Sequence, residues 1–184
     1  LCLQPPSAPP PSSPSPPSSP APSWPACWFT GDVVIEVSDA AEPTDRKFLS
    51  TSDDGTDISL WSSIESTGNQ LWTIADAGSD TVTIKTAGVP TDLVYLNTGA
   101  QGLVIDLWSS NSTGNQQWTI ASVGDTGLVT IATAGAPTDR VFLSTNSDGS
   151  EIMLWENASS NEQWEVVCLQ PPSAPPPSSP SPPS

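Results

Sequence analysis

The chain has 184 residues, which is room for one domain or at most two small ones. Four Lys and Arg residues stand against 20 Asp and Glu residues, and the net charge of −16 argues against nucleic acid and anionic membranes as partners. The absence of His removes Ser–His and Cys–His nucleophiles and His-containing zinc sites. No apolar run approaches the roughly 18 residues of a membrane span, so we predict no membrane insertion.

The N-terminal segment is a proline tract. Of the 22 prolines of the chain, most lie in residues 1–26 and 169–184. Residues 3–26 carry no charge and are rich in Pro, Ser and Ala. As polyproline II at about 3.1 Å per residue, they would form a spacer of roughly 75 Å. A flexible linker is the alternative interpretation.

The two tracts share one sequence. Residues 2–18 and residues 168–184 both read CLQPPSAPPPSSPSPPS. We interpret the chain as one unit of a tandem array, in which residues 1–26 end the linker of the preceding unit, residues 27–168 form a globular domain, and residues 169–184 begin the next arm. Local duplication of a tract on both sides of one domain is the alternative.

The three cysteines fit this arrangement. Cys27 and Cys168 bracket the globular segment, so we predict that they form a disulfide. Cys2 is the repeat equivalent of Cys168 and would pair with the preceding unit. Closing so long a loop stabilises a domain by about 4–5 kcal/mol in the chain-entropy model. Structural disulfides indicate an oxidising compartment, so we predict an extracellular location.

The globular segment contains a three-fold repeat of about 47 residues. Pro-Thr-Asp begins at residues 43, 90 and 137, and Leu-Trp begins at residues 60, 107 and 154. Short runs of β-branched and alternating residues between Gly, Asp, Asn and Ser turns indicate about four strands per repeat and about twelve in all. The fold class is therefore all-β, and three equal repeats favour a β-trefoil, which brings its two ends together. The clearest predicted strands are Val33–Val37, Phe48–Ser50, Ile58–Trp61, Leu71–Ala75, Thr81–Thr86 and Leu128–Ala132.

A second tryptophan in each repeat has a recognisable context. The three segments read Gln70-Leu71-Trp72, Gln116-Gln117-Trp118 and, as a variant, Glu162-Gln163-Trp164. They resemble the QxW signature of ricin B-type β-trefoils, and the resemblance extends over roughly residues 29–167. It implies that these three tryptophans belong to the core.

The same resemblance implies candidate sugar-binding positions. In that family a site uses an Asp near the second strand, an aromatic platform and an Asn near QxW. The Asp position reads Ser50, Asn97 and Ser144 here, so no repeat keeps the carboxylate, and the second repeat comes closest. Two alternatives remain: the tryptophans pack on hairpins or at an interface, or they bind the proline-rich arm of another unit. The candidate residues for sugar or arm binding are Trp61, Asn69, Asn97, Asp106, Trp108, Asn115 and Trp155.

Two acidic turns, at residues 52–57 and 146–151, raise the question of calcium. Calcium takes about 6–8 oxygen ligands, commonly from Asp-rich loops that contain Gly. Neither turn has the full spacing of such a loop, and Asp-Gly is an ordinary hairpin signal. We interpret both as turns, with calcium as the alternative, and predict no metal site and no cofactor.

The Ser-Pro pattern of the arms resembles hydroxyproline-rich glycoproteins of plant and green-algal walls, including extensin-like stalks and algal flagellar-hair proteins. This resemblance implies covalent arabinose- or galactose-type glycans on hydroxylated prolines. Asn111 and Asn157 also begin N-glycosylation sequons. The implied modified prolines are Pro5, Pro6, Pro9, Pro10, Pro11, Pro14, Pro16, Pro17, Pro20, Pro22, Pro171, Pro172, Pro175, Pro176, Pro177, Pro180, Pro182 and Pro183.

The sequence leads first to a structural function. We predict a repeat unit of an extracellular glycoprotein filament or a cell-wall or cell-surface fibre, with copies of the chain in head-to-tail contact. The alternative is a multivalent secreted lectin of ricin B-type, with sites centred on Trp108. An enzyme is not expected, because nothing in the chain marks a catalytic site.

Overall fold

The computed structural model describes residues 24–38, 45–88, 92–99, 104–111, 113–135 and 139–169. Cys2, the candidate modified prolines of both arms and the three Pro-Thr prolines lie outside these residues. Within them the structure is almost entirely β, as predicted. The strands are β1 (Val33–Val37), β2 (Phe48–Thr51), β3 (Ile58–Trp61), β4 (Trp72–Gly78), β5 (Thr81–Thr86), β6 (Tyr95–Thr98), β7 (Ile105–Trp108), β8 (Trp118–Ser122), β9 (Val129–Thr133), β10 (Phe142–Thr145), β11 (Ile152–Trp155) and β12 (Gln163–Cys168).

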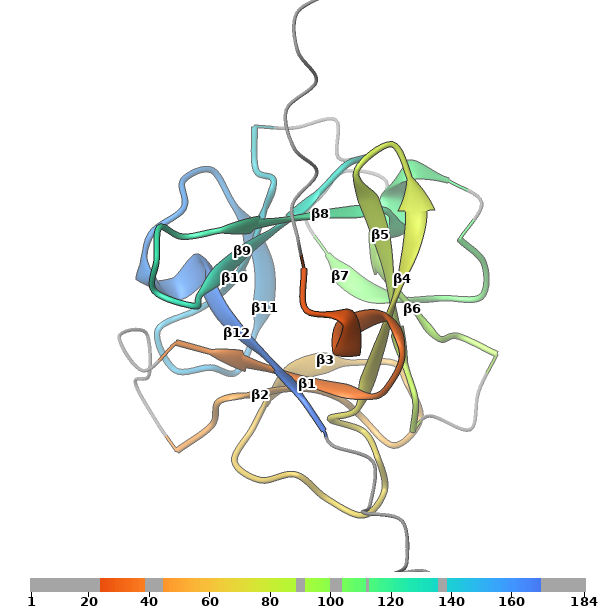
Figure 1. Cartoon of the computed structure of the whole chain (residues 1–184). Helices are drawn as coiled ribbons and strands as arrows, with labels where there is room; N and C mark the ends of the chain where they lie inside the picture. Colours follow the sequence, from red (N-terminus) through yellow and green to blue (C-terminus); the bar gives the residue numbers. More distant parts are fainter. Residues whose placement is uncertain are drawn as a thin grey trace, which may run out of the picture.

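Six strands close into a barrel. Antiparallel pairs join β1 to β4, β4 to β5, β5 to β8, β8 to β9, β9 to β12 and β12 back to β1. The closing pair is the first and last strand, with Val33 opposite Cys168 and Val37 opposite Trp164. The two ends of the globular segment are therefore neighbours, as predicted from the repeat (Figure 1).

The other six strands form three hairpins. The β2–β3, β6–β7 and β10–β11 pairs have four residue pairs each, and each hairpin joins the barrel through its first strand. Figure 1 shows the resulting three-fold arrangement around the barrel axis. The fold is a β-trefoil, which confirms the predicted class.

The core repeats with the sequence. Trp72, Trp118 and Trp164 are fully buried, and the indole N–H of each donates to a backbone carbonyl, that of Leu49, Leu96 and Leu143, at 2.9, 3.0 and 2.9 Å. Each of these hydrogen bonds thus links the barrel strand that contains the tryptophan (β4, β8 or β12) to the first strand of the preceding hairpin (β2, β6 or β10). The second strand of each hairpin adds a buried leucine from the Leu-Trp pair. These leucines are Leu60, Leu107 and Leu154.

Among the described residues, three short 3₁₀ helices interrupt the β structure: η1 (Ala26–Phe29), η2 (Gly114–Gln116) and η3 (Ser160–Glu162). The sequence does not predict these helices, because segments of three or four residues carry no periodicity that could reveal them. In η1, Trp28 is buried and stacks on Trp24 with the ring centroids 5.1 Å apart. No helix among the described residues is long and apolar enough to cross a membrane.

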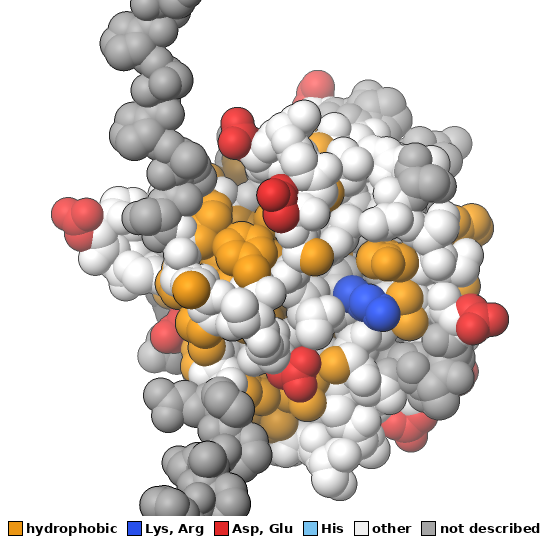
Figure 2. Space-filling view, turned by 45° about the vertical axis from the view of Figure 1, so that its right-hand side comes forward, with side chains coloured by type: hydrophobic (Ala, Val, Ile, Leu, Met, Phe, Trp, Pro, Cys, Tyr) orange, Lys and Arg blue, Asp and Glu red, His pale blue; other side chains and the backbone are white. Residues whose placement is uncertain are grey.

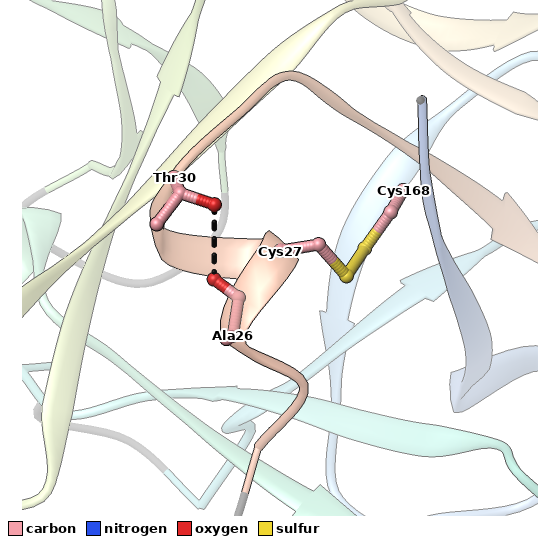
Figure 3. The surroundings of a disulfide bond; sticks show 4 residues. All are labelled: Ala26, Cys27, Thr30 and Cys168. Atoms are coloured by element: carbon pink, nitrogen blue, oxygen red, sulfur yellow. Dashed lines mark hydrogen bonds between the residues drawn. A yellow bond between two sulfur atoms is a disulfide. The ribbon is translucent and has the colours of Figure 1, made fainter. Parts of the chain in front are cut away.

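A disulfide joins Cys27 in η1 to Cys168 at the end of β12, with the two Cα atoms 6.0 Å apart (Figure 3). The hydroxyl of Thr30 donates to the carbonyl of Ala26 and holds the turn that presents Cys27 (Figure 3). The described chain therefore enters and leaves the trefoil at one place, with the disulfide between the two points.

Candidate functional site

Each hairpin of the trefoil presents one tryptophan at the end of its second strand. Trp61, Trp108 and Trp155 are 40%, 50% and 45% exposed, because the preceding leucine points into the core and side chains alternate along a strand. Each of the three lies directly across the hairpin from an aromatic residue. These partners are Phe48, Tyr95 and Phe142. The packing of tryptophans on hairpins is thus present, and it still leaves much of each indole open to solvent.

In the first repeat the indole borders a cleft of about 350 Å³. Its N–H donates to Glu65 Oε1 at 2.8 Å. Glu65 lies four residues after Trp61, on the loop that leads to the QxW segment. The backbone N–H of Glu65 in turn donates to the side-chain oxygen of Gln70 at 2.9 Å, and Gln70 is buried. A chain of hydrogen bonds therefore fixes the ring of Trp61 before any ligand arrives.

The same cleft is also lined by a carboxylate–amide pair, Asp53 and Asn69. The side-chain N–H of Asn69 donates to Asp53 Oδ1 at 2.7 Å, although the two residues are 16 positions apart. Asn69 is buried, whereas Asp53 is exposed on the turn between β2 and β3. Asp57 and Ser59 line the same cleft.

Asp53 is the residue that the sequence analysis missed. Ser50 stands at the position where the resemblance implied an Asp, and its hydroxyl accepts a hydrogen bond from Gln70 Nε2 at 2.8 Å, a structural contact. The carboxylate comes instead from the acidic turn, three residues further on. The available signal was that turn itself, which the sequence analysis interpreted only as a turn or a calcium loop.

The second repeat has the predicted residues but uses them internally. Asn97 is buried, and its side-chain N–H donates to Asp106 Oδ1 at 2.5 Å. Its side-chain oxygen accepts from Gln116. The hydroxyl of Thr98 donates to the backbone carbonyl of Asn115. Asn97 therefore uses one amide hydrogen and its amide oxygen within the fold, while Trp108 remains exposed.

The third repeat has a cleft of about 300 Å³ bordered by Trp155, Met153 and Asn161. The guanidinium of Arg140 lies 5.5 Å from the centre of the Trp155 indole, a cation–π contact. The side-chain N–H of Asn161 donates to the backbone carbonyl of Thr145. This cleft has an aromatic wall and an amide, and its inner carboxylate, that of Glu162, is buried and hydrogen-bonded within the fold.

The acidic turns have the geometry of turns. Asp54 Oδ1 accepts from the hydroxyl of Ser52 at 2.7 Å and from the hydroxyl and backbone N–H of Thr56 at 2.8 and 3.1 Å. These hydrogen bonds, led by that from Ser52, lower the pKa of Asp54 from 3.8 to about 2. In the same way, hydrogen bonds from Ser150 lower the pKa of Asp148. No cluster of three or more potential metal ligands occurs in the part of the chain that the structure describes.

The N-glycosylation candidates both lie on the surface. Asn111 follows β7 and Asn157 follows β11, and both side chains are exposed. Apolar side chains also gather on one face of the molecule, with acidic side chains scattered around them (Figure 2). Trp24 and Phe29 border a groove of about 680 Å³ that the turn between β4 and β5 also lines.

No protein-family model matches the sequence, and no curated protein matches it. Solved structures do match. SeviL bound to asialo-GM1 saccharide has a TM-score of 0.57 at 13% identity, with 74% of this chain and 96% of that chain covered. The shared feature is the β-trefoil fold.

Two further structures show the same likeness. Polyporus squamosus lectin, bound to the human-type influenza-binding epitope Neu5Acα2-6Galβ1-4GlcNAc, has a TM-score of 0.57 at 20% identity, with 74% of this chain and 48% of that chain covered. The exo-β-1,3-galactanase 1,3Gal43A from Clostridium thermocellum has a TM-score of 0.61 at 22% identity, with 76% of this chain and 30% of that chain covered. The trefoil thus occurs in lectins and as one part of a glycosidase.

Proposed function

We propose that this protein is an extracellular, non-enzymatic carbohydrate-binding β-trefoil whose principal site is the cleft of the first repeat. The observation that carries the proposal is the preorganisation of that cleft. Glu65 fixes the indole of Trp61, and Asp53 fixes the amide of Asn69. The proposed site is therefore centred on Trp61, whereas the lectin alternative from the sequence was centred on Trp108.

The chemistry of the cleft suits a neutral sugar. The apolar face of a pyranose ring can stack on the exposed indole of Trp61. The other carboxylate oxygen of Asp53, Oδ2, and the side-chain oxygen of Asn69 can accept hydrogen bonds from sugar hydroxyls. Donors and acceptors held in place lose little entropy on binding. Asp53, Asp57 and Glu65 give the cleft a negative potential, which opposes sialic and uronic acids.

A binding measurement with two matched variants tests this proposal. The secreted protein is screened on a glycan array and its best neutral ligand is titrated by calorimetry. We expect Trp61→Ala to weaken binding at least tenfold, because the stacking surface is lost, and Asp53→Asn to weaken it as well. Trp108→Ala serves as the control and should retain the affinity. Wild-type affinity in Trp61→Ala would overturn the proposal.

A second candidate function rests on a separate observation, the identity of residues 2–18 and 168–184. It is the structural role: trefoils strung on proline-rich arms as units of a glycoprotein filament, with other copies of the chain as partners. The position of Cys27 and Cys168 at one end of the barrel supports it, because both arms would then attach at one place. Peptide mass spectrometry of native material tests it. Bare prolines in both tracts, with no periodic filament in micrographs, would contradict it.

A further inference from the structure

The loop after each exposed tryptophan differs between the repeats in one chemical respect. In the third repeat Asn157 follows Trp155 by two residues, and in the second Asn111 follows Trp108 by three. Both asparagines begin N-glycosylation sequons, whereas the corresponding loop of the first repeat has no sequon and places Glu65 on the indole of Trp61. The repeat with the preorganised cleft is thus the one without a sequon.

The fold gives the hydroxyl residue of each sequon a structural role. The hydroxyl residue of each sequon caps a 3₁₀ helix: Ser159 donates its hydroxyl to Glu162 Oε2, and Thr113 donates its hydroxyl to Gln116 Oε1 at 2.7 Å. These two residues have a structural reason to be present. The side chain of Asn157 is exposed and takes no part in this capping contact.

Distance along the chain places a sugar on Asn157 within reach of the indole. Two residues span at most about 7 Å, so the Cα atoms of Trp155 and Asn157 are no further apart than one sugar ring bridges. Trp155 is 45% exposed even with Arg140 over its ring, so aromatic surface remains for a ligand. A tethered ligand also has an effective concentration in the millimolar range, which is enough to fill a weak site.

We propose that N-linked glycans on Asn157 and Asn111 fold back onto Trp155 and Trp108 and occupy these two aromatic surfaces, so that Trp61 alone remains for an external sugar. The count of one open site per trefoil rests on the proposed function; the contact between glycan and indole does not. The donor is a lipid pyrophosphate-linked oligosaccharide. Asn157 Nδ2 forms a bond to the anomeric carbon, the bond from that carbon to phosphate oxygen breaks, an amide proton is released, and lipid pyrophosphate leaves.

Hydroxyl-radical footprinting tests this contact directly. The full chain is secreted from eukaryotic cells, occupancy of Asn157 is read by peptide mass spectrometry, and the oxidation rate of each tryptophan is measured. We expect Trp155 to be oxidised at least threefold more slowly in the glycosylated protein than in Asn157→Gln. Asn111→Gln is the matched control: it should expose Trp108 and leave Trp155 protected. Enzymatic removal of N-glycans from the folded wild type should reproduce both effects without any substitution.

Two results would overturn the inference: an Asn157 that is never glycosylated, or an oxidation rate of Trp155 that does not change when its glycan is removed. Calorimetry distinguishes failure of this inference from failure of the proposed function. If Trp155 is protected but no free sugar binds at Trp61, the glycan contact stands and the binding function fails. If sugar binds with Trp61 dependence and Trp155 is equally reactive in all forms, the binding function stands and this inference fails.

Discussion

Tryptophan has two distinct roles in each repeat, one on a barrel strand and one on a hairpin. Trp118 is fully buried and its indole N–H reaches the carbonyl of Leu96, whereas Trp108 is half exposed on the neighbouring hairpin. The first kind of tryptophan completes the core. The second kind packs across its hairpin and leaves about half of its indole open to solvent.

The same conservative substitution at both positions should separate the two roles. We expect Trp118→Phe to lower the free energy of unfolding by about 2–4 kcal/mol, because it leaves a cavity and a buried carbonyl without a donor. Trp108→Phe should change it by less than about 0.5 kcal/mol. Urea unfolding followed by circular dichroism measures both, and equal losses would contradict the assignment of roles.

Asp54 provides a prediction in pH. Its pKa is lowered from 3.8 to about 2 by hydrogen bonds from Ser52 and Thr56, so the folded state favours the ionised form. The sign follows: the contribution to stability is fully present above pH 3.8 and is lost as the pH falls toward 2. A carboxyl-carbon NMR titration should show Asp54 ionised at pH 3. In Asp54→Asn the unfolding midpoint should lose this part of its dependence on pH, and an unshifted titration of Asp54 would contradict the prediction.

At the scale of elements, the first residue of each QxW segment connects a hairpin to a 3₁₀ turn or loop. Gln70 accepts from the backbone of Glu65 and donates to Ser50, while the buried Glu162 accepts from Ser159 and from the hydroxyl of Ser144. An amide and a carboxylate thus make the same connection, because a serine hydroxyl can accept in one repeat and donate in the other.

This equivalence predicts an asymmetric pair of variants. Glu162→Gln should leave the unfolding midpoint unchanged or raise it, because the new amide can donate to Ser144 as Gln70 donates to Ser50, and a buried carboxylate is removed. Glu162→Ala should lower the free energy of unfolding by about 2–4 kcal/mol, since it removes the acceptor of the Ser159 N–H and leaves the buried Ser144 hydroxyl with only the carbonyl of Thr145 at 3.4 Å. Chemical unfolding measures both. Equal destabilisation would show that η3 requires the charge.

The strands could be predicted from the sequence, and the site only in part. The predicted bounds of three strands, Val33–Val37, Ile58–Trp61 and Thr81–Thr86, are the observed ones. These bounds could be predicted because the same pattern of residues recurs in all three repeats. The pairing of Asp53 with Asn69 could not be predicted, since it depends on how far a turn of one hairpin reaches across to another loop. Linear motifs give residue types at fixed spacing; a cleft depends on loop conformation.

For the whole molecule, the position of the disulfide decides how the trefoil responds to tension. The described chain enters next to Cys27 and leaves next to Cys168, and these residues are bonded with their Cα atoms 6.0 Å apart. A force on the chain ends therefore passes from arm to arm through the sulfur atoms. The segment between the two cysteines, which are 141 positions apart, includes the twelve strands that the structure describes, and it carries none of this force.

Single-molecule pulling from the chain ends should show this bypass. With the disulfide intact, we expect extension without any unfolding step of the trefoil. Reduction, or the double substitution Cys27→Ser and Cys168→Ser, puts the β1–β12 pair under load, and unfolding should then release roughly 490 Å of chain at about 3.5 Å per residue. The double variant should also lose up to about 5 kcal/mol of stability in chemical unfolding, from the longer loop of its denatured state. A step of that length in the oxidised protein would contradict the bypass. If the oxidised protein shows no such step, each trefoil of an array joined through such arms would stay folded under loads that stretch the arms, and its clefts would keep their shape.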